Sequence, residues 1–154
     1  MQLDQLDKRI LTELQRDAGQ SLDALADRVG ASRNTCWRRV QRLEAEGVLL
    51  RRVALLDPTK VNAPLAVFIV VRTARHAADA TEALRAAVLA TPEIVGAYRT
   101  AGEIDYILHA RVPDVPAYDR LYKKLTARLE MSDVSASFVM EEIKAVTELP
   151  LDFA

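Results

Sequence analysis

The residues best suited to bind another molecule lie between Ser32 and Leu43, where the chain carries four arginines, one asparagine and one tryptophan but no acidic residue. Arginine and asparagine can pair with base edges in the DNA major groove, and further guanidinium groups can contact phosphates. At about 100° per residue, Cys36, Val40 and Leu43 fall on one apolar stripe of a helix. The candidates for DNA contact in this helix are Ser32, Arg33, Asn34, Thr35, Trp37, Arg38 and Arg42.

The surrounding segment, residues 21–50, has the pattern of two short helices joined by a tight turn. Ser21 can cap the first helix and Gly30 can supply the turn. Ser32 can cap the second helix, which Gly47 ends. A helix-turn-helix of this kind places its second helix in the major groove. A solvated surface helix with a basic face is the alternative for the arginines alone, but the caps, the turn and the first helix favour contact with DNA.

Two further elements complete the expected domain. Residues 3–20 carry leucine and isoleucine at helical spacing, which predicts a third helix that stops near Gly19. Residues 48–58 are rich in β-forming side chains and end in an Asp-Pro turn signal. We expect a strand pair there, forming the wing of a winged helix. Arg51 and Arg52 would then be available for DNA phosphates, although solubility of the strand is an alternative role for both.

Length and composition limit the class of protein. A chain of 154 residues can form one ordinary domain or two small ones, and 50% hydrophobic residues are enough for a core. No apolar run approaches the length of a membrane span, and no signal-peptide pattern opens the chain. One cysteine forbids an internal disulfide and fits a reducing compartment. We therefore expect a cytoplasmic protein without a membrane partner.

Charge is distributed unevenly along the chain. The net charge is −1, but residues 1–60 hold 11 Lys+Arg against 9 Asp+Glu, whereas residues 61–154 hold 10 against 13. The basic charge is thus local, and the second half has another task. A monomer with so little excess positive charge should bind DNA modestly, so we expect a homodimer or a larger assembly.

The second half has the pattern of a ferredoxin-like β-α-β-β-α-β domain. Its first segment is apolar on both faces, which suggests burial on one side and contact with a partner on the other. The expected elements are a strand at 64–73, a helix at 77–90, strands at 94–101 and 105–112, a helix after Pro113 and Pro116, and a long strand at 134–146. The predicted fold class is α+β, with a winged helix-turn-helix domain and linker strand at 1–60 and the ferredoxin-like domain at 61–154.

Five motifs occur in an order and spacing typical of one family: LDQLDKRILTELQRDA, LADRVGAS, RVQRLEAEGVL, ALLDP and GEIDYILHARV. Over nearly its whole length the chain resembles Lrp/AsnC transcriptional regulators, also called feast-famine regulators. The resemblance implies a winged helix joined to a domain that binds amino acids and drives assembly into dimers and octamers. Two-fold pairing would place two recognition helices on a palindromic operator in double-stranded DNA.

The turn around Gly102 is the candidate effector site. A glycine there permits a positive φ, exposed amides could hold an α-carboxylate, and Asp105 could accept a hydrogen bond from an α-ammonium group. From the residues alone, Gly102 and Asp105 could equally be ordinary turn residues. The resemblance implies an effector pocket between subunits, to which it assigns Thr100, Ala101, Gly102, Ile104 and Asp105.

The chain departs from the family pattern in two places. Val61 and Asn62 stand where the family commonly has a glycine after the ALLDP segment. Residues 129–134 lack the Leu-Pro-Gly-Val that the family tends to show before the last strand, which should change a loop near the effector site.

A narrower resemblance concerns the effector itself. TCWRRVQRLEAEGVL and SDVSASFVMEEIKAVTELP resemble the members that sense cysteine and activate its degradation, which implies L-cysteine as the ligand. Cys36 does not itself argue for thiol sensing, because it lies on the inward stripe and a buried cysteine usually acts as a small hydrophobe.

Other chemistry finds little support in the sequence. His76 and His109 have no partners at metal-ligand spacing, and no phosphate loop or nucleophile elbow is present, so we expect no metal, no catalytic residue and no cofactor beyond the amino-acid effector. The two-domain architecture also resembles that of siroheme decarboxylases, so an enzyme of that kind is the alternative. The intact basic face between Arg33 and Arg42 argues against it.

Overall fold

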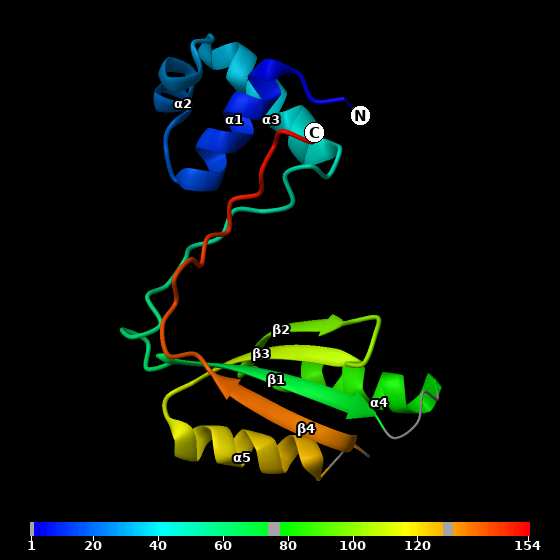
Figure 1. Cartoon of the computed structure of the whole chain (residues 1–154). Coiled ribbons are helices and arrows are strands. Elements are labelled where there is room, and N and C mark those ends of the chain that lie inside the picture. Colours follow the sequence, from blue (N-terminus) through cyan, green and yellow to red (C-terminus); the bar gives the residue numbers. More distant parts are fainter. Residues whose placement is uncertain (1, 74–77, 128–130) are drawn as a thin grey trace. The chain divides into compact units, whose positions relative to one another are not determined.

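The computed structural model describes residues 2–73, 78–127 and 131–154, and the chain forms two compact units. The first unit comprises Met1–Leu55 together with Lys144–Ala154, and the second comprises Leu56–Ile143. Figure 1 labels the elements of both units. The sequence-based division kept residues 144–154 in the second domain, whereas the structure groups them with the N-terminal helices.

The first unit contains three helices: α1 (Gln5–Arg16), α2 (Leu22–Val29) and α3 (Arg33–Ala45). Each begins at the residue type that satisfies its free backbone amides. Ser21 Oγ accepts a hydrogen bond from the amide of the third residue of α2, and Ser32 Oγ does the same for α3, both at 3.1 Å. Gly30 ends α2 in the left-handed conformation at φ 66°. The predicted caps and the predicted turn are therefore confirmed.

The three helices share one apolar core. Ile10 of α1, Leu25 of α2 and Leu43 of α3 are each at most 1% exposed and belong to the same cluster. Cys36 is also fully buried in this cluster, and burial raises the pKa of its thiol. The predicted inward stripe of α3 is thus confirmed, and the cysteine packs as a small apolar side chain.

The predicted strand pair of the wing is not formed. No strand is present in the described segment 46–64, and Leu50, Val53 and Leu55 are 60–86% exposed. The prediction was wrong because it relied on β-propensity, which mainly reflects packing against neighbouring strands. Without a ladder of hydrogen bonds to a second strand, this segment remains extended chain.

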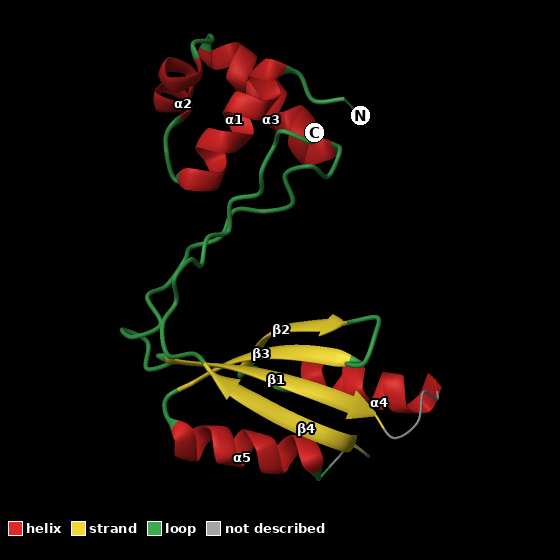
Figure 2. Ribbon diagram, in the orientation of Figure 1, coloured by secondary structure: helices red, strands yellow, loops and turns green. Residues whose placement is uncertain are grey.

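The second unit contains a four-stranded antiparallel sheet in the order β2-β3-β1-β4, with two helices (Figure 2). Its order along the chain is the predicted β-α-β-β-α-β. The elements are β1 (Leu65–Thr73), α4 (Ala78–Leu89), β2 (Ile94–Arg99), β3 (Tyr106–Val112), α5 (Val115–Thr126) and β4 (Met131–Phe138).

Alternation along β1 separates the two faces of the sheet. Val67 and Ile69 are buried in a core that includes Leu121 of α5 and is packed by Val88 of α4, so both helices cover one face. Phe68 points to the other face, where it is 41% exposed. The expectation that β1 is buried on one side and available to a partner on the other agrees with this pattern.

The last strand is shorter than predicted. The sequence pattern extends to residue 146, but β4 ends at Phe138, which pairs with Val67. In this antiparallel register Leu65, the first residue of β1, would face residue 140, so β1 offers no partner to residues 141–146. The chain therefore leaves the sheet, and Met140 is 95% exposed.

One of the two departures from the family pattern has a structural explanation. Asn62 lies shortly after the ALLDP segment, where the family commonly has a glycine, and it adopts a positive φ of 57°. Asparagine tolerates this left-handed conformation better than most residues other than glycine. The other departure, at residues 129–134, lies partly outside the described residues.

Candidate DNA-binding and ligand-binding sites

The N-terminal half of α3 presents a polar, solvent-exposed surface. Arg33, Asn34 and Arg38 are exposed, and Trp37 is exposed by 51% despite its large ring. Ser32 and Thr35 also lie here, but their hydroxyls pair with each other at 2.8 Å as part of the cap. The structure therefore brings the predicted DNA-contact residues of this half-helix onto one accessible end of α3.

The four arginines of α3 do not have equal surroundings. Arg39 donates to Asp4 at 2.5 Å and to Asp7 at 3.1 Å, and Arg42 donates to Asp7 at 2.5 Å. Arg33 lies 3.3 Å from Asp23, and both of those side chains are more than two-thirds exposed, so this pair is weak.

Arg38 stands apart from the other three. It is exposed and, within the described part of the chain, has no ion pair or side-chain hydrogen bond. An unpaired guanidinium group at the surface needs no internal contact to be broken before it binds an external anion or base edge.

Asp7 joins α1 to α3. Its side chain is only 1% exposed, although it carries a charge. It also completes a capping box with Asp4, because each side chain accepts a hydrogen bond from the other residue's backbone amide. We refer to Asp4, Asp7, Arg39 and Arg42 as the α1–α3 ionic cluster.

The cluster also shifts the pKa values of Asp4 and Arg39. The amide of Asp7 and then the guanidinium of Arg39 lower the pKa of Asp4, while hydrogen bonding to Asp4 raises the pKa of Arg39. Both groups therefore stay ionised at neutral pH. Two of the positive charges on α3 are balanced by carboxylates of the same unit, and Arg42, although its side chain is 38% exposed, is paired with the buried Asp7.

The two arginines after α3 also differ from each other. Arg52 donates to Glu44 of α3 at 3.0 Å, whereas Arg51 is exposed and, among the described residues, has no side-chain partner. Because the expected wing strands are not formed, neither arginine is held on a rigid hairpin.

The turn between β2 and β3 contains all five predicted effector residues. Thr100 closes it, because its amide donates to the Asp105 carbonyl at 2.9 Å and its hydroxyl donates to the Ile104 carbonyl at 2.5 Å. Gly102 has a φ of 124°, a conformation that favours glycine, and nothing lies within 4 Å of the position of a Cβ atom. The positive φ of Gly102 agrees with the prediction, whereas contact of this turn with a ligand stays a prediction.

Asp105 has a role that the sequence did not indicate. Its Oδ2 atom accepts hydrogen bonds from the amide of Thr73 at 2.7 Å and from the Thr73 hydroxyl at 3.0 Å. These contacts fix the end of β1 to the turn. Any interaction with a ligand would therefore come in addition to this structural contact.

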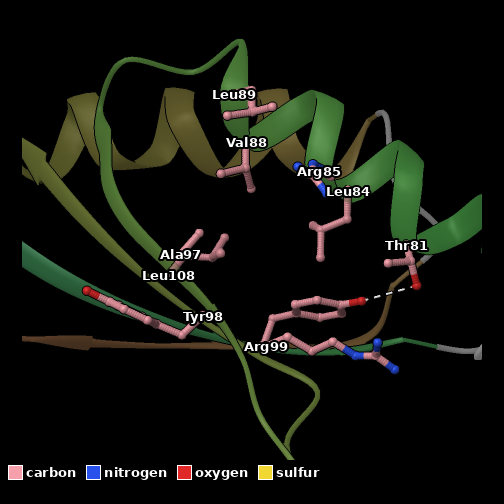
Figure 3. Close-up of a pocket in the computed structure, with 10 residues that line it drawn as sticks. Thr81, Leu84, Arg85, Val88, Leu89, Ala97, Tyr98, Arg99 and Leu108 are labelled. Carbon is pink, nitrogen blue, oxygen red and sulfur yellow. Dashed lines mark hydrogen bonds between the residues drawn. The ribbon is translucent and has the colours of Figure 1, made fainter. Parts of the chain in front are cut away.

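A pocket of about 420 Å³ lies beside this turn (Figure 3). Leu84 and Val88 point from α4 toward Ala97 and Leu108 of the sheet, and the Tyr106 hydroxyl donates to Thr81 at 3.3 Å. The remaining lining residues are Arg85, Leu89, Tyr98 and Arg99.

None of the predicted effector residues lines this pocket, but Arg99 and Tyr106 come immediately before and after them. Arg85 and Arg99 are the positively charged groups in the lining that sequence analysis missed. No local signal identifies Arg85, because its place in the pocket depends on how α4 crosses the sheet.

The histidines do not form a metal site in the described residues. Among those residues, no group of three or more His, Cys, Asp or Glu side chains could hold a metal ion. His109 stacks on Phe68 with ring centroids 4.7 Å apart, and burial, followed by nearby Arg111, lowers its pKa. His76 lies outside the described residues. Nor is any helix in the described part of the chain both long and apolar enough to cross a membrane.

Comparison with known protein families decides the identity of both units. Residues 3–49 match a winged helix-turn-helix DNA-binding domain, and residues 66–149 match the Lrp/AsnC ligand binding domain. The chain belongs to the Lrp/AsnC family. The predicted resemblance, the predicted fold class and the predicted function of a DNA-binding, amino-acid-responsive transcriptional regulator are confirmed, and the comparisons do not favour the enzyme alternative.

Similar proteins support this assignment over almost the whole chain. The glutamate uptake regulatory protein of Zymomonas mobilis is 46% identical over 149 residues, covering 97% of this chain and 91% of that protein. The crystal structure of an AsnC family transcriptional regulator from Agrobacterium tumefaciens is 48% identical, with a TM-score of 0.94 and coverage of 98% and 99%. The transcriptional regulator NMB0573 from Neisseria meningitidis, solved with L-Met, is 37% identical, with a TM-score of 0.94 and coverage of 99% of each chain.

The buried carboxylate of Asp7 generates a prediction for stability. We expect Asp7→Asn to lower the free energy of unfolding of the first unit by about 1–3 kcal/mol, because the guanidinium groups of Arg39 and Arg42 lose a charged acceptor. Urea unfolding followed by the fluorescence of Trp37, the one tryptophan of the chain, measures this change.

Asp23→Asn is the matched control, since it removes an equal charge from an exposed pair and should change stability by less than about 0.5 kcal/mol. Equal effects of the two substitutions would show that the burial of Asp7 confers no special stability.

Proposed function

We propose that the exposed end of α3 reads the operator through Arg33, Asn34, Trp37 and Arg38, with Ser32 and Thr35 at the helix start near the phosphate backbone. The observation that supports this proposal is that the arginines of α3 differ in their internal partners. Arg39 and Arg42 are balanced by buried or capping carboxylates, whereas Arg38 is exposed without an internal partner in the described residues. An arginine in this state can donate to guanine in two parallel hydrogen bonds.

The remaining predicted DNA contacts have lesser roles in this proposal. Arg42 positions α3 through Asp7 and does not itself read bases. Arg51, together with Arg52 once it leaves Glu44, contacts phosphates beside the operator half-site. Contacts of that kind add affinity without specificity, and salt weakens them.

We also propose that a small amino acid is the effector and that the β2–β3 turn binds its polar end. The amides around Gly102 are accessible to an α-carboxylate, and Asp105 carries the negative charge that an α-ammonium group requires. Thr100, Ala101 and Ile104 complete the turn. The adjoining pocket is largely apolar, with Leu84, Val88 and Leu108 in its lining, and it suits an uncharged side chain.

Two amino acids are the first candidates for this site. L-cysteine is the effector that the narrower sequence resemblance implies. L-methionine is bound in the Neisseria relative, and its longer apolar side chain also fits a pocket of about 420 Å³. Both have apolar thiol or thioether side chains and differ chiefly in length, so a direct comparison tests the pocket.

The active form is proposed to be a homodimer built on the uncovered face of the sheet. Phe68 and His109 stack there, and Tyr98 is 62% exposed. Large apolar side chains exposed on one face of a sheet are typical of a protein interface. A dimer supplies the two recognition helices that a palindromic operator requires. Assembly of such dimers into an octamer, and location in the cytoplasm, remain predictions from the sequence. We further infer that the protein regulates transcription without catalysing a reaction.

Arg38 provides the direct test of the DNA-binding surface. On labelled DNA from upstream of the protein's own gene, Arg38→Ala should weaken operator binding by about 5- to 150-fold, the effect of losing one bidentate base contact worth about 1–3 kcal/mol. Binding to scrambled DNA should change far less. The measurement is a titration at several salt concentrations.

Arg120→Ala is the control for Arg38→Ala, because it removes the same charge from an exposed position on α5. Its operator affinity should match that of the wild type. An Arg38→Ala protein that binds its operator with wild-type affinity would remove Arg38 from the interface.

Asp105→Asn tests the effector site more cleanly than truncation to alanine. Asparagine keeps an oxygen that can accept from Thr73, so the end of β1 stays in place, but it loses the charge that pairs with an α-ammonium group. We expect calorimetric titration with L-cysteine and L-methionine to show about tenfold to hundredfold weaker binding of the effector.

Asp119→Asn on the exposed face of α5 is the charge-matched control for this experiment. Unchanged amino-acid affinity in the Asp105→Asn protein would contradict the assignment of Asp105 to the effector site.

A further inference from the structure

The chain crosses between its two units twice. It leaves the first unit after Leu55, folds into the sheet and helices of the second, and returns after Ile143. Residues 144–154 therefore belong to the compact unit of α1, α2 and α3, although they follow β4 of the other unit. A single linker would not require this return, and the returning segment makes specific contacts with α1.

Gln15 of α1 binds the backbone of the returning segment through both ends of its carboxamide. Its Nε2 donates to the carbonyl of Leu149 at 3.2 Å, and its Oε1 accepts from the amide of Leu149 at 2.7 Å. This two-point contact satisfies the backbone of one residue as a neighbouring strand would. The adjacent Glu148 carboxylate lies 3.8 Å from Arg16, which adds a weak ion pair.

Two residues further on, Leu151 enters the surface of the helical unit. It is partly buried and packs against the same core that contains Leu11 and Val29. Leu151 and Asp152 line a groove of about 350 Å³ whose other walls come from α1 and α2. The walls carry more basic than acidic groups, which suits Asp152: they include Lys8, Arg9, Arg28 and Glu13.

These contacts are specific but few. The side chain of Leu149 is 72% exposed and Phe153 is 92% exposed, so only the backbone at 149 and the side chain at 151 are engaged closely. A contact of this size can open and close without unfolding the helices, because regions with few buried apolar contacts open at low free-energy cost.

We propose that residues 148–151 are a clasp, a docking segment of this chain that binds Gln15 of α1, packs Leu151 against the helical core, and holds the DNA-binding unit by a second connection. The first connection, residues 50–64, contains no strand in the described chain and would by itself leave that unit free to reorient. With the clasp closed, the unit is held at two points, which limits rotation of α3. The consequence for operator geometry rests on the proposed function; the docking itself does not.

Time-resolved fluorescence anisotropy of Trp37 in the full-length protein tests the clasp without DNA. This residue is the one tryptophan of the chain and lies on α3, so its depolarisation reports motion of the DNA-binding unit. We expect Gln15→Ala/Leu151→Ala to add a fast component on the nanosecond timescale to the slow tumbling seen in the wild type.

Leu149→Ala is the matched control, because Gln15 binds the backbone of residue 149 and not its exposed side chain. It should decay like the wild type. Gln15→Glu keeps the acceptor for the Leu149 amide but loses the donor to its carbonyl, and should give a smaller fast component. Circular dichroism confirms the helices, and Gln15→Ala alone replaces the double variant if Leu151→Ala unfolds. A wild-type anisotropy decay in the folded clasp variant would overturn the proposal.

A second measurement tests the consequence for DNA. Insertion of about 5 bp between operator half-sites turns one half-site to the opposite side of the duplex. The wild type should lose most of its operator affinity on this DNA, whereas the clasp variant should lose at least about fivefold less, because its recognition helices can reorient. Equal losses would overturn the claim that the clasp sets half-site geometry. Failure of the wild type to bind any operator would contradict the proposed function, while the anisotropy result would still decide whether the clasp exists.

Discussion

The organisation of the DNA-binding unit depends on the ion pairs that the carboxylate of Asp7 makes with two arginines of α3. This carboxylate lies buried between α1 and α3 and accepts hydrogen bonds from Arg39 and Arg42. A buried charge is costly unless it is paired, so this arrangement strongly favours one rotation of α3 about its own axis. That rotation places Cys36 and Leu43 in the core, and it leaves the start of the helix exposed.

The same contact divides the arginines of α3 into two groups. Arg39 and Arg42 hold the helix in place, and Arg38 is left for the proposed binding of DNA. A stretch with four arginines and no acid, such as residues 33–43 of α3, would repel its own charges and bind any polyanion. Balancing Arg39 and Arg42 from α1 leaves a smaller positive surface, in which Arg38 projects without an internal partner in the described residues. Fewer free charges mean a smaller contribution from phosphates and a greater dependence of affinity on base contacts.

In the second unit, Asp105 has a comparable position. It ties the β2–β3 turn to Thr73 at the end of β1, and it is also the proposed partner of an amino acid. A ligand that changed this contact would act on the end of β1, which pairs with the start of β4. β4 in turn leads into the segment that returns to the DNA-binding unit. The proposed effector site is therefore connected to the clasp through the end of β1 and through β4.

The features that could be predicted from the sequence are those that local chemistry determines. Ser21, Gly30 and Ser32 act within a few residues of their own positions, and apolar periodicity gave the order of elements in both units. In the α1–α3 ionic cluster, the capping box could have been predicted from the spacing of Asp4 and Asp7. The pairing of these carboxylates with Arg39 and Arg42 could not. That pairing depends on how two helices cross.

The missed features all involve contacts between distant parts of the chain. The wing strands were predicted from β-propensity, which does not supply a partner strand. β4 was predicted too long because the limit is set by where β1 begins. Arg85 and Arg99 were not identified because the pocket exists only when α4 lies over the sheet. The return of Leu149 to Gln15 joins residues separated by 134 positions, and no local pattern reports it.

The most direct test of this account is a double-mutant cycle between Asp7 and Arg42. Unfolding free energies of the wild type, Asp7→Asn, Arg42→Gln and the double variant are measured in urea by the fluorescence of Trp37. We predict a coupling free energy of at least about 1 kcal/mol, because Arg42→Gln leaves the buried Asp7 carboxylate with one charged partner fewer and Asp7→Asn leaves Arg42 without its charged acceptor. Additive effects, with a coupling below about 0.3–0.5 kcal/mol, would contradict the claim that this pair holds α3 in place.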